Sequence, residues 1–169
     1  QDDVNYPWQK YNQGTFSAAV EDHFSLSDQW KLIGGLSLDY LDKISGENRT
    51  KLNPLIGLKF TPCESLDLHI SVSQKSKFPS MRSMYSTSSG NPDLLSETGT
   101  NAEVGFTLNK GIYLSGAAFL NRFKDLIDTY RLPDGTRRYF NIGKSHINGF
   151  EIQAQKALGW AEATLNYTY

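Results

Sequence analysis

Hydrophobic and polar residues alternate along most of this chain, and a period of two is the signature of β-strands. In the segment 29–41, for example, Trp30, Leu32 and Leu36 share one face, whereas Lys31 and Asp39 share the other. Helical spacing, in which apolar residues recur three or four positions apart, is weak throughout. We therefore expect eight strands, over residues 14–24, 29–41, 51–61, 65–75, 98–109, 111–131, 137–156 and 160–169.

The two faces of these strands differ in charge. The apolar face of the second to fifth strands carries no Asp, Glu, Lys or Arg between Trp30 and Leu108, whereas the opposite face is charged. A Lys or Arg in contact with lipid at the bilayer midplane costs roughly 2–4 kcal/mol, so an uncharged face suits a membrane strand. The segment 111–131 is apolar on both faces, and its orientation stays open. Aromatic residues near strand ends suit the girdles of a membrane barrel: Trp30, Tyr40, Phe60, Tyr113, Trp160, Tyr167 and Tyr169.

The connections between the strands alternate in length. Short connections at 25–28, 61–65, 109–111 and 157–159 are separated by longer ones at 42–49, 78–98 and 132–137. Membrane β-barrels have this asymmetry, with short periplasmic turns and long extracellular loops. The spacing predicts an up-and-down antiparallel meander, and Pro54 inside the third strand predicts a bulge, an irregular pair or a weaker strand there.

Composition narrows the class of protein. A chain of 169 residues is one domain by length, and its net charge of −1 gives no electrostatic case for nucleic acid. The single Cys63 excludes an internal disulfide and a cysteine metal cluster. No run of about eighteen apolar residues exists, so a membrane helix is not expected, and barrel strands remain possible. The chain starts without a secretory signal and stops inside an alternating run, so we expect both ends to be cut from a larger protein.

The sequence offers no catalytic or metal-binding constellation. His23, His69 and His146 lie on different strands without metal-ligand spacing, and only His69 with Ser71 or Ser73 resembles a catalytic pair. No glycine loop precedes a helix, and no HExxH or CxxC motif exists. We therefore expect no enzyme activity, no metal and no cofactor.

Several motifs appear in a fixed order. The segment 78–85 reads FPSMRSMY, GNPDL follows at 90–94, and Glu97 precedes NAEVGF at 101–106. Further motifs are WKLIGGLSLD at 30–39, NPLIGLKFTP at 53–62, NRFKDLI at 121–127, YFNIGKSHINGFE at 139–151 and NYTY at 166–169. Together they resemble the TonB-dependent outer-membrane receptors, which import iron chelates, cobalamin and other scarce nutrients into bacteria.

The resemblance implies a 22-stranded transmembrane barrel filled by an N-terminal plug. Residues 1–169 would then be a single partial domain of an all-β fold, an antiparallel up-and-down barrel fragment of about eight strands, without the plug and the terminal strands. It also implies a bacterial outer-membrane location. The implied partners are a small-molecule nutrient chelate, the protein's own plug and remaining barrel strands, the TonB energising complex and outer-membrane lipid.

Two outer connections are candidate binding sites, since loops on a rigid scaffold carry function. In the loop 79–97 the candidate ligand contacts are Arg82, Met84, Tyr85 and Asn91, whose alternative role is to pack the loop. Beside the Asp-Gly turn the candidates are Arg131, Arg137, Arg138 and Tyr139, which would suit an anionic iron chelate. In the alternative, these residues belong to a solvated loop or contact lipopolysaccharide.

The resemblance also bears on the interior and on the nutrient. It places Glu103 and Glu151 inside the barrel, where pairing with an arginine is more common than ligand binding. Haem-uptake members of the family carry a histidine between the two central boxes, and the segment 78–94 has none, which argues against haem. We expect uptake of an iron siderophore or cobalamin. The alternatives are a small eight-stranded structural or adhesive barrel and a soluble β-sheet binding module.

Overall fold

The computed structural model describes residues 10–43 and 48–169, which form eight strands and one short helix. The predicted strands are confirmed, with bounds that differ by at most a few residues. No helix in the described ranges has the length and apolar character to span a bilayer. The elements are β1 (Gln13–Ser25), β2 (Trp30–Lys43), β3 (Arg49–Cys63), β4 (Leu66–Lys77), α1 (Met81–Tyr85), β5 (Glu97–Asn109), β6 (Tyr113–Arg131), β7 (Arg137–Ala157) and β8 (Glu162–Thr168).

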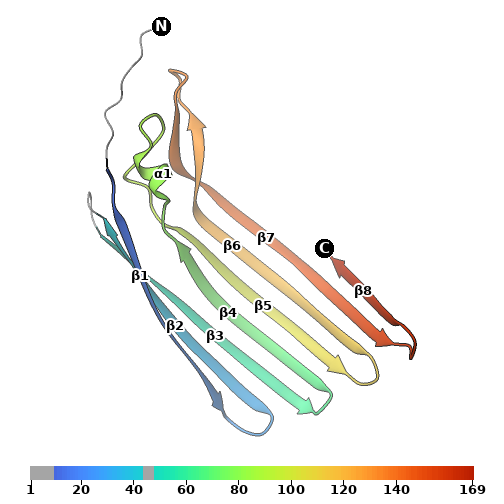
Figure 1. Cartoon of the computed structure of the whole chain (residues 1–169). Coiled ribbons are helices and arrows are strands. Elements are labelled where there is room, and N and C mark those ends of the chain that lie inside the picture. The colour runs from blue at the N-terminus through green and yellow to red at the C-terminus, as the bar shows by residue number, and fades with distance from the viewer. Residues whose placement is uncertain (1–9, 44–47) are drawn as a thin grey trace.

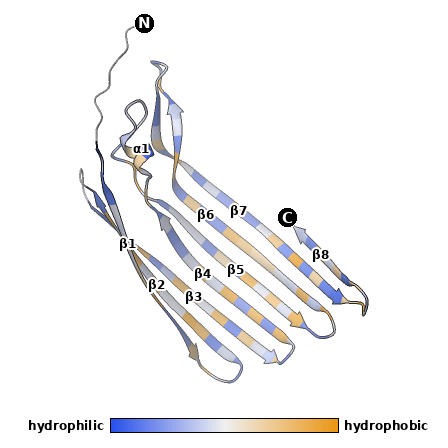
Figure 2. Ribbon diagram, in the orientation of Figure 1, coloured by the Kyte–Doolittle hydropathy of each residue, from blue (hydrophilic) through white to orange (hydrophobic). Residues whose placement is uncertain are grey.

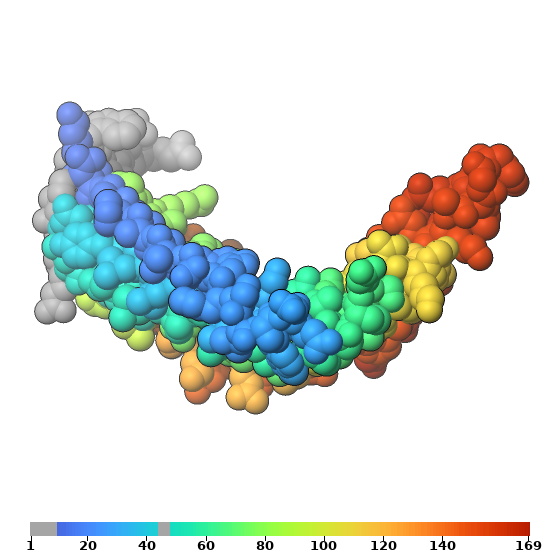
Figure 3. All heavy atoms as spheres, turned by 90° about the horizontal axis from the view of Figure 1, so that it is seen from below, coloured from blue at the N-terminus to red at the C-terminus, as the bar shows by residue number. Residues whose placement is uncertain are grey.

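The strands form one sheet in which each strand lies antiparallel to its neighbour in sequence (Figure 1). The order runs from β1 to β8 without a crossover, as an up-and-down meander predicts. β1 and β8 are the two edges, and the described residues of these two strands do not pair with each other. The sheet is open and curved (Figure 3), whereas a closed eight-stranded barrel would need this pairing.

The pairing register assigns the residues of each strand to one of two faces. Val104 lies opposite Ala118, and Ala102 lies opposite Leu120, so the even-numbered residues of β6 continue the apolar face of β5. Phe119 and Tyr113 therefore belong to the polar face, which settles the orientation of β6. Tyr113 is thus a correction to the predicted aromatic girdle. Hydrophilic and hydrophobic positions alternate along the strands (Figure 2).

The apolar face is uncovered. Val20 is 68% exposed and Ile56 is 58% exposed, and in the described ranges the only buried hydrophobic residues of the core are Leu41, Met84 and Leu94. A soluble sheet would pack such a face into a core, because apolar surface in water is unfavourable. A sheet with one mainly apolar, uncovered face and one polar face instead suits a barrel wall, with lipid outside and a wet interior. We call the apolar face the outer face and the polar face the inner face.

The inner face carries charge pairs and amide contacts between neighbouring strands. The Lys59 ammonium lies 2.9 Å from the Asp67 carboxylate, which also accepts a hydrogen bond of 2.6 Å from the Thr61 hydroxyl. The Asn101 amide donates to the Asn121 amide oxygen at 2.8 Å. These contacts satisfy polar groups in the barrel interior, where each pair is worth at most about 1 kcal/mol when solvated.

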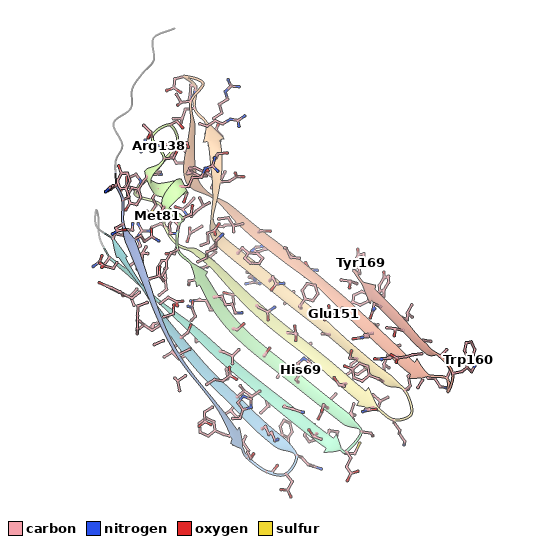
Figure 4. The ribbon with its side chains drawn as sticks, viewed as in Figure 1. His69, Met81, Arg138, Glu151, Trp160 and Tyr169 are labelled. Carbon is pink, nitrogen blue, oxygen red and sulfur yellow. The ribbon has the colours of Figure 1, made fainter. Side chains whose placement is uncertain are left out.

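Aromatic residues lie at the short-turn end of the sheet. The rings of Trp30 and Phe60 stack on the outer face with centroids 4.2 Å apart. Trp160, between β7 and β8, is 93% exposed (Figure 4). Amphipathic rings in this position suit the membrane–water interface.

The register shifts in the sheet lie at positions that the sequence did not indicate. Pro54 lies opposite Leu36 in β2, and the pairing of β3 with β4 starts one residue later, at Leu55. A proline has no N–H to donate, so it lies just outside the second ladder. The register shift in β3 falls between Phe60 and Cys63, away from Pro54. A further irregularity in β6 follows Phe123.

The helix α1 was not expected from the sequence. Ser80 caps it, because the Ser80 hydroxyl accepts a hydrogen bond of 3.1 Å from the Ser83 N–H. The main-chain N–H of Ser86 closes the other end by donating to the Arg82 carbonyl at 3.1 Å. A five-residue helix is too short to show an amphipathic period, which explains why the pattern did not reveal it.

Candidate ligand-binding surface

The loop 79–97 connects β4 to β5 at the long-loop end and lies against the inner face. The C-terminal part of the loop contacts β3, where the Arg49 guanidinium donates a hydrogen bond to the Leu94 carbonyl. The Lys43 ammonium donates to the Pro92 carbonyl at 3.5 Å. In Figure 3 this segment rises on the concave side of the curved sheet. The loop therefore covers part of the barrel interior.

Asn141 on β7 fixes the end of this loop from the other side. Its amide oxygen accepts from the Leu95 N–H at 2.7 Å, and its amide nitrogen donates to the Leu95 carbonyl at 3.0 Å. The same nitrogen donates to the Asp125 carbonyl at 2.7 Å. Asp125 has a φ of 56°, a left-handed conformation that Asp tolerates better than most residues. Asn141 thus joins the loop to the irregular stretch of β6 around Asp125.

A second set of contacts ties the loop to the start of β7. The Asn91 amide donates to the Tyr139 carbonyl at 2.9 Å, and the Tyr139 N–H donates to the Ser89 carbonyl at 3.0 Å. Glu97 accepts a hydrogen bond of 2.9 Å from the Ile127 N–H and lies 3.1 Å from the Lys77 ammonium. The two sequence-predicted sites, the loop 79–97 and the β6–β7 hairpin, are therefore parts of one structure.

The loop has a small core of its own. Met84 and Leu94 are each 1% exposed, and Pro79 and Ser96 are also fully buried. Gly90 completes a tight turn, because its N–H donates to the Ser86 carbonyl at 2.7 Å and a Cβ there would lie 2.6 Å from main-chain atoms. These contacts make the loop compact despite its length.

The predicted contacts in the loop have different surroundings. Arg82 is exposed on α1 and is open to a ligand. Tyr85 stacks on Tyr11 with ring centroids 4.3 Å apart, and Asn91 bonds main chain. Met84 is a correction: its side chain is buried in the loop core, so it packs the loop and offers no surface to a ligand.

The β6–β7 hairpin ends in a tight turn. The Gly135 N–H donates to the Leu132 carbonyl at 2.9 Å, and Gly135 takes the left-handed conformation with a φ of 87°. The Asp134 carboxylate accepts from the Thr136 N–H at 2.9 Å and from its hydroxyl at 2.7 Å. These two hydrogen bonds, first from the hydroxyl, lower the pKa of Asp134 below its ordinary value.

The pleat of the hairpin separates its arginines. Arg131 lies opposite Arg137. Arg137 shares a strand face with Tyr139 and Asn141, and the Asn141 amide contacts the loop on the inner face. Arg138 lies opposite Tyr130 on the other face. Figure 4 labels Arg138 beside the hairpin, below its tip and near the loop that carries α1. Like charges directly opposite each other repel, so the Arg131–Arg137 pair would gain from a bound anion.

Further down the inner face lies a cavity of about 370 Å³. His69 and Glu103 line it with Glu151, and the His69 ring nitrogen is 3.2 Å from the Glu103 carboxylate. Figure 4 labels His69 and Glu151 on this part of the sheet, well below the hairpin tip. Among the described residues, the His69 ring bonds Glu103, and the hydroxyls of Ser71 and Ser73 form no hydrogen bond with it. The described part of the chain contains no group of three or more metal-ligating side chains.

Sequence reasoning missed the residues that hold this surface together. Asn141 belongs to the motif at 139–151, but its spacing gives no sign that Leu95 and Asp125 are its partners. Lys43 and Arg49 lie near the two ends of the predicted connection 42–49 and contact carbonyls more than forty residues away. Only the fold brings these segments together.

Comparisons with known proteins agree with this architecture. A family model described as TonB dependent receptor-like, beta-barrel, matches residues 1–169. A vitamin B12 transporter BtuB of Vibrio vulnificus is 32% identical over 101 residues, which are 59% of this chain and 16% of that protein. BtuB of Vibrio cholerae El Tor Inaba is 31% identical over 140 residues, 82% of this chain and 22% of the relative.

Solved structures share the fold at lower identity. The hemophore receptor HasR of Serratia marcescens superimposes with a TM-score of 0.82 at 18% identity, over 94% of this chain and 34% of HasR. The siderophore receptor PirA of Acinetobacter baumannii gives a TM-score of 0.77 at 23% identity, over 93% of this chain and 27% of PirA. The chain spans about a fifth of the length of the curated relatives it matches. It belongs to the TonB-dependent receptor family, as a segment of the β-barrel that these proteins place in the bacterial outer membrane.

Proposed function

We propose that this barrel segment belongs to an importer that takes up a scarce nutrient, an iron siderophore or cobalamin, across the outer membrane. The observation that carries the proposal is the anchored loop 79–97, which Arg49 and Asn141 hold against the inner face from two sides. A long connection fixed over a barrel interior is suited to ligand recognition, because a preorganised surface loses little entropy on binding. Its location at the long-loop end suits capture from outside the cell.

The charge of the surface favours an anionic nutrient. Arg131 and Arg137 face each other across the hairpin on the inner side, and Arg82 is exposed on α1. Guanidinium groups bind carboxylates and phenolate-type oxygens through several donors at once. Ferric siderophores that carry net negative charge would gain from these groups. The identity to vitamin B12 transporters supports cobalamin as the second candidate.

The remaining partners belong to the same proposal. The inner face would contact a plug domain, and the energy for transport would come from the TonB complex through that plug. The polar cavity near Glu103 and Glu151 supports such a contact, since two carboxylates and one imidazole favour a basic partner segment. We propose transport without catalysis, because within the described residues the His69 ring bonds the Glu103 carboxylate and not the hydroxyl of Ser71 or Ser73.

A growth experiment tests this function. The gene is deleted, and candidate iron chelates and cobalamin are supplied one at a time as the sole source of iron or of the vitamin. We expect growth to fail on one nutrient and to return with the intact gene, but only in cells with a working TonB complex. Full growth on every nutrient, with the deletion verified, would contradict the proposal.

A further inference from the structure

The turn between β6 and β7 leads directly into two consecutive arginines. Arg137 and Arg138 form the only pair of adjacent basic residues in the sequence. Residues 133–138 are all exposed, and within the described ranges no ion pair joins either guanidinium to a carboxylate. Successive side chains of a strand point to opposite faces, so the two cations project on opposite sides of the peptide bond between them.

These arginines lie on a two-stranded ribbon that extends beyond the rest of the sheet (Figure 1). The pairing of β5 with β6 ends at Lys124, whereas β6 and β7 stay paired up to Arg131 and Arg137. A two-stranded hairpin without a sheet or core behind it is marginally stable in water. The last pair also sets Arg131 against Arg137, and like charges directly opposite each other weaken the pairing. The end of the ribbon therefore opens more easily than the sheet below it.

The main chain of Arg137 faces away from β6. The Leu132 N–H donates to the Thr136 carbonyl, and hydrogen-bonded and non-hydrogen-bonded pairs alternate from there along an antiparallel ladder. Arg137 and Tyr139 therefore both belong to non-hydrogen-bonded pairs. The Tyr139 N–H confirms this direction, because it donates to the Ser89 carbonyl of the loop. Among the described residues, the Arg137 carbonyl accepts no hydrogen bond.

A free main chain of this kind is what an endopeptidase needs. A peptide that docks as an extended strand pairs its main chain with a strand edge of the protein that binds it. The carbonyl of the bond to be cut must also be free to accept hydrogen bonds from an oxyanion hole. Other exposed basic residues lack this combination, since Arg82 is helical and Arg122 has strand partners on both sides.

We propose that the Arg137–Arg138 bond is a processing site for a cell-surface endopeptidase that recognises paired basic residues. Water adds across the bond, so that Arg137 ends one fragment as a carboxylate and Arg138 begins the next as an amine. Because the two guanidinium groups point in opposite directions, the protease has an acidic pocket on each side of the bond that it cuts.

The cut would act on the candidate binding surface as a one-way switch. Tyr139 follows Arg138, and its N–H and carbonyl bond the Ser89 carbonyl and the Asn91 amide of the loop 79–97. Separating β7 from its turn removes a chain connection that keeps Tyr139 in place, so the loop loses support on this side. Cleavage requires no nutrient, so its failure is distinguishable from failure of import: fragment masses report the one and growth reports the other.

The test follows the full-length receptor in the strain that produces it. Intact cells are incubated for increasing times and then denatured at once, so that no cleavage occurs after harvest, and mass spectrometry identifies the fragments. We expect one fragment that begins at Arg138 and a partner that ends at Arg137. Both should increase with time as the full-length chain decreases.

Three variants test what the protease recognises. Arg137→Gln and Arg138→Gln should each slow the cut at least about tenfold, because each leaves one acidic pocket without its cation. Arg122→Gln removes an exposed cation from the fully paired part of β6 and should leave the rate unchanged. The shift in electrophoretic migration on heating shows that each variant is an assembled barrel.

The possible contrary results differ in meaning. Absence of the fragment pair from wild-type cells would show that this bond is not processed. Slowing in only one of the two arginine variants would show a protease with a single acidic pocket, and slowing in neither would show that the cations are not recognised. A cut that falls mainly at Arg82 or Arg122 would show that the free strand edge does not select the site. Each of these results would overturn the proposal.

Discussion

Asn141 is the residue whose substitution should loosen the candidate binding surface most selectively. The Asn141→Ala substitution deletes three hydrogen bonds, two to Leu95 and one to the Asp125 carbonyl. Each contributes about 0.5–1.5 kcal/mol net. The two bonds to Leu95 are solvent-exposed, so water replaces them in part, and we expect the total loss to be about 2 kcal/mol.

This loss should affect local opening of the loop and not unfolding of the sheet. The strands keep their own ladders, and a loop with few buried contacts opens as a separate unit. Hydrogen exchange on the full-length receptor, read by mass spectrometry or NMR, measures that opening. About 2 kcal/mol corresponds to roughly 30-fold faster exchange. The informative amides are those of Gly90, Asn91 and Tyr139, because the substitution leaves their own hydrogen bonds in place.

Two comparison variants make the result specific. Asn141→Asp keeps the acceptor for the Leu95 N–H but sets a carboxylate oxygen against the Leu95 and Asp125 carbonyl oxygens, so we expect an acceleration at least as large as in Asn141→Ala. Asn121→Ala removes an amide contact with Asn101 on the same inner face and should leave the loop amides protected. Unchanged protection of Gly90, Asn91 and Tyr139 in Asn141→Ala would refute the anchoring role.

Three further predictions concern the same surface. Gly90→Ala places a Cβ 2.6 Å from main-chain atoms of Met84 and Ser86, and we expect a local cost of about 1–3 kcal/mol, seen as faster proteolysis within 79–97; a loop as resistant as the wild type would count against it. Met84→Ala should destabilise the loop by about 2–4 kcal/mol through its buried cavity, measured by hydrogen exchange, while Arg82→Ala should not. The lowered pKa of Asp134 means that its turn is fully stabilised above the ordinary carboxyl pKa and loses this stabilisation as the pH falls through the lowered value. The Thr136 amide should therefore lose protection from hydrogen exchange only below about pH 4. Loss of this protection at neutral pH would contradict the assignment.

The strands could be predicted from sequence because the pleat ties side-chain direction to position. The run 14–24, for instance, became β1 at Gln13–Ser25. The facing of β6 could not be predicted, because both of its faces are apolar. Space on the neighbouring strand decides it: a Cβ on Gly149 would lie 2.9 Å from the Phe119 ring, so a glycine is what allows this ring on the inner face. Such a match between two strands is invisible in either one alone.

That the two candidate segments lie at one end of the sheet was predictable, but the contacts between them were not. A loop of this length between regular strands indicates function, and both candidate segments lie at the predicted end of the sheet. Leu95, which bonds Asn141, and Leu94, which bonds Arg49, are each more than forty residues away from their partner in sequence, and no local rule links such distant groups. Met84 was misjudged for the same reason, since only the folded loop buries its side chain.

The most direct test of the account is the affinity of the full-length receptor for the nutrient that the growth experiment identifies. Calorimetry would compare the wild type with Arg131→Ala/Arg137→Ala, which removes the inward pair, and with Arg138→Ala, which removes the outward arginine of the same hairpin. We predict that the double variant loses at least tenfold in affinity and that Arg138→Ala binds as the wild type does. Equal affinity in all three proteins would contradict the claim that this surface contacts the nutrient.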